Sequence, residues 1–144
     1  KVKIQEDIIL DNQDYGSKRT LEISSIDEIS KRIVTCAANE TTTVAVFNSN
    51  AYGAAGAVDI EDSKYIRVTN LDSSNAVELA VVGAATLYQV TLAAGQSHVL
   101  GSADGLMLAE ADTSPSFGTM ADISSLQVNP GSNAVSVEVF IASA

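Results

Sequence analysis

His98 is the only histidine of the chain and lies in the stretch TLAAGQSHVL at residues 91–100. Catalysis by histidine requires an acid that orients the ring and a nucleophile within hydrogen-bond reach. The sequence nominates neither group. Gly95 provides a bend, and the residues after it alternate as on a strand, with His98 and Leu100 on one face. We therefore predict an architectural role for His98.

Cys36 is the only cysteine, so it has no partner for a disulfide within the chain. A zinc site built from Cys36 and His98 would need two further ligands from carboxylates scattered along the chain. In the run IVTC, a free thiol that packs as a small apolar group is the simpler interpretation. We expect neither a zinc site nor a disulfide at this position.

The stretch DIEDS at residues 59–63 contains three carboxylates, and hard cations take oxygen ligands. An EF-hand beginning at Asp59 requires glycine at its sixth and glutamate at its twelfth position, where this chain has Lys64 and Asn70. That motif is excluded. A looser calcium site made of Asp59, Asp62 and a distant carboxylate stays open beside the alternative of a solvated turn.

Gly53 and Gly56 in YGAAGAV lack the third glycine and the following Lys-Ser of a phosphate-binding loop. We interpret this segment as a flexible loop. No pair of carboxylates is singled out for glycoside cleavage. We therefore expect no catalytic residue, no metal and no cofactor.

Apolar and polar residues alternate with a period of two along most of the chain, which predicts strands. In AVSVEVFIA at residues 134–142, one face carries valines and an isoleucine, and the other carries Ser136, Glu138 and Phe140. Turn-forming residues separate these segments at short intervals. This pattern predicts about eight strands in an all-β sandwich or barrel. The other expected strands are at 41–47, 64–70, 76–82, 87–92 and 97–100.

Residues 1–19 mix charges with short apolar groups and predict an arm, followed by a single domain at 20–144. The arm could add as a strand to a neighbouring sheet, and the alternative is a frayed terminus. Residues 21–36 carry conflicting signals. Ser25 and Glu28 have the spacing of a capping box, but the β-branched residues favour a strand.

The formal net charge is −10, and beyond residue 33 the basic residues are Lys64 and Arg67. A surface of that sign repels phosphate, which argues against nucleic acid as a partner. The longest apolar run in KVKIQEDIIL is too short for a signal peptide or a membrane span, so we expect no membrane partner.

Residues 64–142 contain the strand YIRVTNLD, the turn SSN, the strand AVELAVVG, the hairpin segment LAAGQS at residues 92–97, and the closing strand VSVEVFIAS. This order of turns and strands resembles a family of bacteriophage virion proteins. These proteins are jelly-roll or β-sandwich domains that decorate capsids as cement proteins. The resemblance implies a single antiparallel β-sandwich of jelly-roll type with a short N-terminal arm.

The resemblance also implies a non-catalytic structural protein that binds the outside of an assembled capsid and bridges neighbouring major capsid subunits. Its expected partners are the major capsid protein and further copies of itself, as a homotrimer. Its expected location is the capsid surface of the virion, after assembly in the host cytoplasm.

The alternative function is a receptor-binding or glycan-binding sandwich module of a tail fibre or head fibre. Sugar sites commonly use exposed aromatic platforms, and the chain contains four Tyr, three Phe and no Trp. An enzyme is the third alternative, with no residues nominated for it. Candidate contact residues come from the arm and from two loops: Lys1, Val2, Lys3, Ile4, Lys18, Arg19, Tyr52 and Phe117.

Overall fold

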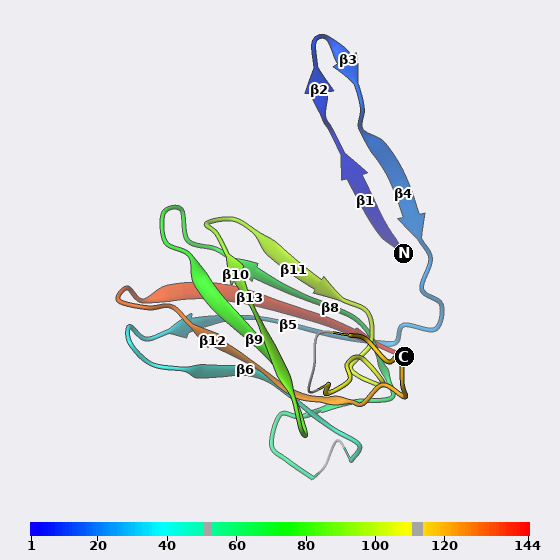
Figure 1. Cartoon of the computed structure of the whole chain (residues 1–144), viewed down its shortest axis with the longest axis vertical. Coiled ribbons are helices and arrows are strands. Elements are labelled where there is room, and N and C mark those ends of the chain that lie inside the picture. Colours follow the sequence, from blue (N-terminus) through cyan, green and yellow to red (C-terminus); the bar gives the residue numbers. More distant parts are fainter. Residues whose placement is uncertain (51–52, 111–113) are drawn as a thin grey trace.

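The structure, a computed structural model, describes residues 1–50, 53–110 and 114–144. A β-sandwich forms the body of the molecule, and a long β-hairpin near the N-terminus projects away from it (Figure 1). The fold is all-β, as the period of two predicts, and the described residues include no helix.

Two sheets make up the sandwich. In the order of hydrogen-bonded neighbours, the five-stranded sheet consists of β10 (Leu87–Leu92), β9 (Val77–Gly83), β12 (Ile123–Asn129), β6 (Thr42–Asn48) and β7 (Val58–Asp59). The four-stranded sheet consists of β11 (Ser97–Leu100), β8 (Ser63–Asn70), β13 (Val135–Ser143) and β5 (Glu28–Cys36).

Strand pairing identifies the sandwich as a jelly roll. With the two-residue β7 set aside, the first strand of the body pairs with the last, β5 with β13, and the second with the next to last, β6 with β12. Further in, β8 pairs with β11, and β9 pairs with β10. This is the pattern of one long hairpin rolled over itself, and it confirms the expected fold class.

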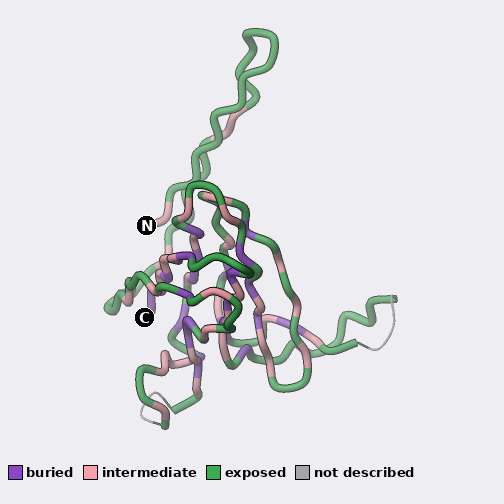
Figure 2. Tube along the Cα trace, turned by 90° about the vertical axis from the view of Figure 1, so that its left-hand side faces the viewer, coloured by how far each residue is buried: buried purple, intermediate pink, exposed green. Residues whose placement is uncertain are grey.

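The core lies between the two sheets, and alternate residues of β8, β9 and β13 are buried there (Figure 2). On β13 the valines at 135, 137 and 139 and Ile141 are at most 3 % exposed, while the residues between them on the outer face include Glu138 and Phe140. The predicted division of this strand into two faces is confirmed. Because β13 has a paired strand on each side, its register with β5 and β8 aligns the whole four-stranded sheet.

A buried amide joins the turns at one end of the sandwich. Asn70, fully buried at the end of β8, shares its side-chain N–H groups among the carbonyls of Asn75, Leu92 and Ala93 at 2.8, 3.1 and 3.2 Å. Its side-chain oxygen accepts the backbone N–H of Asp72 at 2.9 Å. These residues belong to the segments TNLDSSN and LAAGQS, so that part of the sequence pattern encodes a structural junction.

The same turn contains a carboxylate with a perturbed pKa. The backbone N–H groups of Asn75 and Ser74 donate to Asp72, and these hydrogen bonds hold the pKa of Asp72 below its ordinary value. The ionised form is therefore favoured in the folded protein. Its contribution to stability is present at neutral pH and is lost as the pH falls through the lowered pKa.

Replacing Asn70 by Ala should destabilise the protein strongly. The substitution leaves buried carbonyls without a donor, and we expect the free energy of unfolding to fall by about 3 kcal/mol, measured by urea unfolding with an unchanged m-value. The control is Asn133→Ala, because Asn133 is exposed and bonds Asn75 at 3.2 Å on the surface. Equal effects of the two substitutions would contradict the structural role of Asn70.

The structure differs from the sequence-based expectations in three places. The strand β12 was not anticipated, and β7 pairs with β6 in parallel in an otherwise antiparallel sandwich. The arm is a paired hairpin that continues to Leu21, and is neither a lone strand nor a frayed end. In residues 21–36 the favoured strand is confirmed from Glu28 onward as β5, and residues 22–27 before it have no regular structure.

Candidate protein-contact surface

The projecting hairpin consists of two paired segments. Strand β1 (Val2–Glu6) pairs with β4 (Ser17–Leu21), and beyond them β2 (Ile9–Leu10) pairs with β3 (Gln13–Asp14). Asp11 and Asn12 close the hairpin with φ of 50° and 62°. Positive φ at both central residues is the requirement of a type I′ turn, whose twist matches that of the strands, and Asp and Asn tolerate it.

Gly16 lies between the two paired segments of the hairpin, where the two chains approach closely. A Cβ atom at this position would lie 2.0 Å from the carbonyl oxygen of Glu6, which is closer than any side chain can approach. Asp14 accepts the backbone N–H of Gly16 at 2.7 Å, and the N–H of Tyr15 bonds the carbonyl of Ile8 at 2.8 Å. The hairpin therefore needs glycine at this position.

The base of the hairpin carries its apolar residues on one face, here called the apolar face, and only polar residues on the other. Residues opposite each other in an antiparallel pair share a face, and the register places Val2 opposite Leu21 and Ile4 opposite Arg19. The other face pairs Lys3 with Thr20 and Gln5 with Lys18. The apolar face lies open, because Ile4 and Leu21 are 51 % and 53 % exposed.

The outer half of the hairpin, residues 6–15 and here called the tip, combines exposed apolar side chains with acidic ones. Ile8, Ile9, Leu10 and Tyr15 are 52 %, 74 %, 61 % and 59 % exposed. The tip contains no Lys or Arg, and its carboxylates are those of Glu6, Asp7, Asp11 and Asp14. The register puts Ile9 and Asp14 on one face of the tip and Leu10 and Gln13 on the other, so apolar side chains are exposed on both faces, among acidic ones.

The predicted contact residues of the arm come together on this hairpin, but on different faces. Val2, Ile4 and Arg19 share the apolar face, whereas Lys3 and Lys18 lie on the polar face. Lys1 pairs with Glu22 at 2.8 Å, both side chains being exposed. Sequence reasoning missed the tip, although the apolar run IIL followed by Asp-Asn was a usable hairpin signal.

Of the two loop candidates, the structure describes Phe117. Phe117 is in the loop between β11 and β12, is 82 % exposed, and has a positive φ of 51°. Tyr52 lies outside the described residues. Phe117 is therefore an exposed loop residue of the body and is not part of the hairpin.

The outward-facing side of the four-stranded sheet is a second exposed surface, here called the outer face. On β5 it presents Ile29 and Ile33, each 62 % exposed, and on β11 it presents Val99, which is 47 % exposed. The four basic residues of the body are all in two strands of this sheet: Lys31 and Arg32 in β5, and Lys64 and Arg67 in β8.

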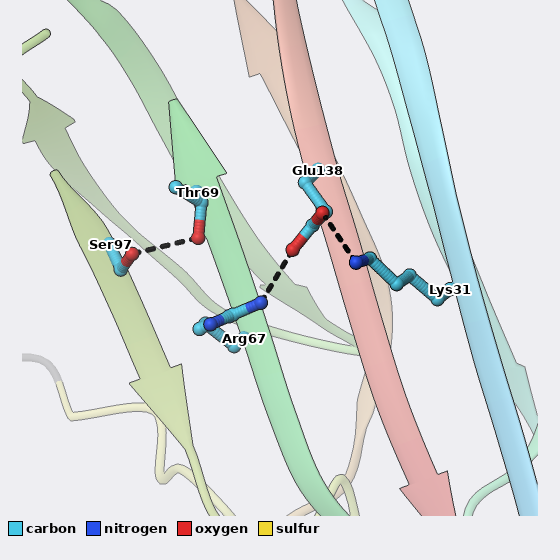
Figure 3. Close-up of polar contacts among 5 residues, drawn as sticks. All are labelled: Lys31, Arg67, Thr69, Ser97 and Glu138. Atoms are coloured by element: carbon cyan, nitrogen blue, oxygen red, sulfur yellow. Dashed lines mark hydrogen bonds and ion pairs between the residues drawn. The ribbon is translucent and has the colours of Figure 1, made fainter. Parts of the chain in front are cut away.

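An ion-pair network lies in the middle of the outer face (Figure 3). Glu138 of β13 forms ion pairs with Lys31 at 3.2 Å and with Arg67 at 2.5 Å. One carboxylate is therefore shared by cations from the strands on both sides. Arg67 also lies over the ring of Phe140, with its guanidinium carbon 5.7 Å from the ring centroid. Ser97 and Thr69 are joined at 2.7 Å in the same view. With two cations and one carboxylate, this network is positively charged.

His98 contacts an aromatic residue of the opposite sheet. Its Nε2 lies 3.1 Å from the hydroxyl of Tyr88 on β10, and the two rings meet edge to face with centroids 5.9 Å apart. Burial lowers the pKa of His98 below its ordinary value, because desolvation disfavours the charged ring. The contact joins strands β10 and β11 between the two sheets, which is an architectural role.

Acidic residues gather near DIEDS without forming a metal centre. A hollow of about 670 Å³ is lined by Asp27, Glu28, Asp59 and Asp62, but Arg32 lines it as well. Over the described ranges, no group of three or more His, Cys, Asp or Glu residues is arranged to hold a metal ion. The hydrogen bond to Asp59, together with the negative charge of Asp59, raises the pKa of Glu61.

Cys36 is fully buried, and its thiol is free. Burial raises the pKa of this thiol, and a weaker hydrogen-bond effect of Thr42 opposes the shift. A buried thiol of raised pKa is a poor nucleophile. Cys36 is therefore part of the core.

Comparisons with known proteins give one distant structural likeness. No protein-family model and no curated protein matches the chain. A solved structure, described as Bacillus endospore appendages that form a novel family of disulfide-linked pili, is similar over 86 % of this chain and 95 % of that one, at 12 % identity and a TM-score of 0.45. Within the part of the chain that the structure describes, no helix is long and apolar enough to cross a membrane.

The burial of His98 predicts a pH-dependent stability. Because the pKa of His98 is lowered on folding, the unfolded chain binds more protons, and stability should fall as the pH drops from about 7.5 to about 5.5. His98→Gln keeps a polar group near Tyr88 but does not titrate. Thermal unfolding of both proteins across this range should show a smaller loss of Tm in the variant, and parallel curves would contradict the prediction.

Proposed function

We propose that this chain is a non-catalytic structural protein of a bacteriophage virion, and that it binds the outside of the capsid and strengthens contacts between neighbouring shell subunits. In this proposal the sandwich is a compact body on the shell surface, and the hairpin is the arm that holds a neighbouring protein. The single observation that carries the proposal is the hairpin, which projects from the body with its apolar residues exposed (Figure 1).

An isolated two-stranded hairpin is marginally stable in water, because it has no second layer on which to bury its apolar face. None of the described hairpin residues is buried, and Ile9 at the tip is 74 % exposed. A protein that leaves such a surface uncovered gains stability when a partner covers it. The hairpin therefore supports a role in assembly.

The body supports the same proposal through its shape and charge. Jelly rolls occur in viral capsid proteins and also in lectins, so the fold class alone does not choose between them. The hairpin contains equal numbers of basic and acidic residues, so the net charge of −10 belongs to the rest of the chain. Such a body stays soluble at high local concentration and is repelled by exposed nucleic acid.

The proposal is tested by adding the purified protein to capsids stripped of accessory proteins. We expect saturable, stoichiometric binding that raises the temperature at which the shells break. Gly16→Ala should reduce this binding at least about tenfold, because a Cβ there displaces the Glu6 carbonyl and distorts the hairpin. The side chains that the hairpin exposes are unchanged in this variant.

Gly101→Ala is the matched control, because a Cβ at Gly101 meets no atom within 4 Å. It should bind shells as the unaltered protein does. Binding to host cells or glycans without binding to shells would contradict the proposal and favour the receptor-binding alternative. If Gly16→Ala and Gly101→Ala bound shells equally well, the hairpin would not be part of the contact with the shell.

A further inference from the structure

We propose that the hairpin tip of one copy of this chain docks on the outer face of the four-stranded sheet of a second copy. The proposed function requires the arm to hold a neighbouring protein, and this inference names that protein as another copy. The contact is a property of the chain by itself and can be tested without a capsid.

The tip has two properties that its partner must match. Its apolar residues are Ile8, Ile9, Leu10 and Tyr15, and all of them are more than half exposed. Its charged residues are all acidic. The partner surface must therefore offer exposed apolar side chains next to positive charge.

The outer face offers this combination on strand β5. Ile29 and Ile33 alternate along the strand with Lys31 between them, and all three point to the same side of the sheet. Both isoleucines are 62 % exposed, and the side chain of Lys31 is 58 % exposed. Arg67 on β8 adds a second cation beside Phe140.

Charge complementarity selects this face from the rest of the body. Of the four basic residues of the body, Lys31 and Arg67 lie on the outer face around Glu138, which leaves this face with a net positive charge. Arg32 instead donates to the carbonyl of Val44 in the other sheet. The five-stranded sheet contains no Lys or Arg in any of its strands, and Glu78 adds negative charge to it. An acidic tip is therefore repelled by most of the body and attracted to the outer face of the four-stranded sheet.

A second copy is the appropriate occupant because the hairpin extends away from its own sandwich (Figure 1). The contact joins two different patches, so it is heterologous. Repeating it from copy to copy generates a closed ring when the rotation between neighbouring copies divides a full turn. One hairpin face of about 30 Å by about 10 Å is smaller than the roughly 800 Å² per partner of a stable interface. A closed ring, in which every copy gives and receives one hairpin, offsets the weakness of each contact.

The contact is tested by disulfide trapping between two single-cysteine additions. Ile9→Cys and Ile33→Cys are prepared as separate full-length chains of different mass, mixed, and oxidised with glutathione. We expect disulfide-linked dimers of one chain of each kind. Cys36 is retained in both, because its thiol is fully buried and its pKa is raised.

The matched control replaces Ile33→Cys by Leu87→Cys, since Leu87 is 53 % exposed on the five-stranded sheet. Mixing it with Ile9→Cys should give few mixed dimers. Equal yields from the two mixtures would overturn the inference. In a chain carrying both Ile9→Cys and Ile33→Cys, a dominant bond within one chain would also overturn it, because the hairpin would then fold onto its own body.

Sedimentation of untagged protein provides an independent measurement. Ile33→Asp should raise the concentration needed for assembly about tenfold, because it removes an apolar contact and places a negative charge opposite the acidic tip, whereas Leu87→Asp should not. A chain that is monomeric over an about hundredfold concentration range would overturn the inference. Self-association without shell binding would contradict only the proposed function, and shell binding without self-association would contradict only the inference.

Discussion

The central position of β13 in the four-stranded sheet is the constraint on which the rest of the structure depends. Its alternate valines and Ile141 are buried against the other sheet, while its backbone bonds β5 on one side and β8 on the other. Because side chains alternate strictly, a shift of one residue would move every apolar group to the solvent side. The same register places Glu138 between Lys31 and Arg67. Packing of the core thus decides which charges meet on the outside.

The two outer surfaces of the sandwich differ in charge as a result. One sheet contains all the basic residues of the body, and the other contains none in its strands. An exposed edge strand such as β5 is a site where sheets associate, and natural proteins commonly place charge there. Lys31 and Arg32 lie in this strand, between Ile29 and Ile33. The face therefore combines exposed apolar groups with positive charge.

Much of the fold could be predicted from the sequence, because its signals are local. The alternation in AVSVEVFIA and LYQVTL identified strands whose bounds lie within a residue of those observed. The strand β12 was not predicted, because ISSLQVN has polar residues on both faces and contains a bulge. The hairpin was expected only as an arm, since pairing of β1 with β4 depends on the turn at Asp11 and Asn12 rather than on periodicity. Of the contact surface, the basic residues of the arm were named, and the apolar tip was not.

By itself, the sequence determined the all-β class, the buried side of the closing strand, and the concentration of negative charge outside the arm. These properties follow from the period of two and from composition, which act between neighbouring residues. Only the tertiary structure decided that β5 pairs with β13, that Asn70 joins three turn carbonyls, and that Ile29 and Ile33 flank an ion-pair network. Those contacts join residues far apart in the chain, and their partners are selected by how two sheets close over one core.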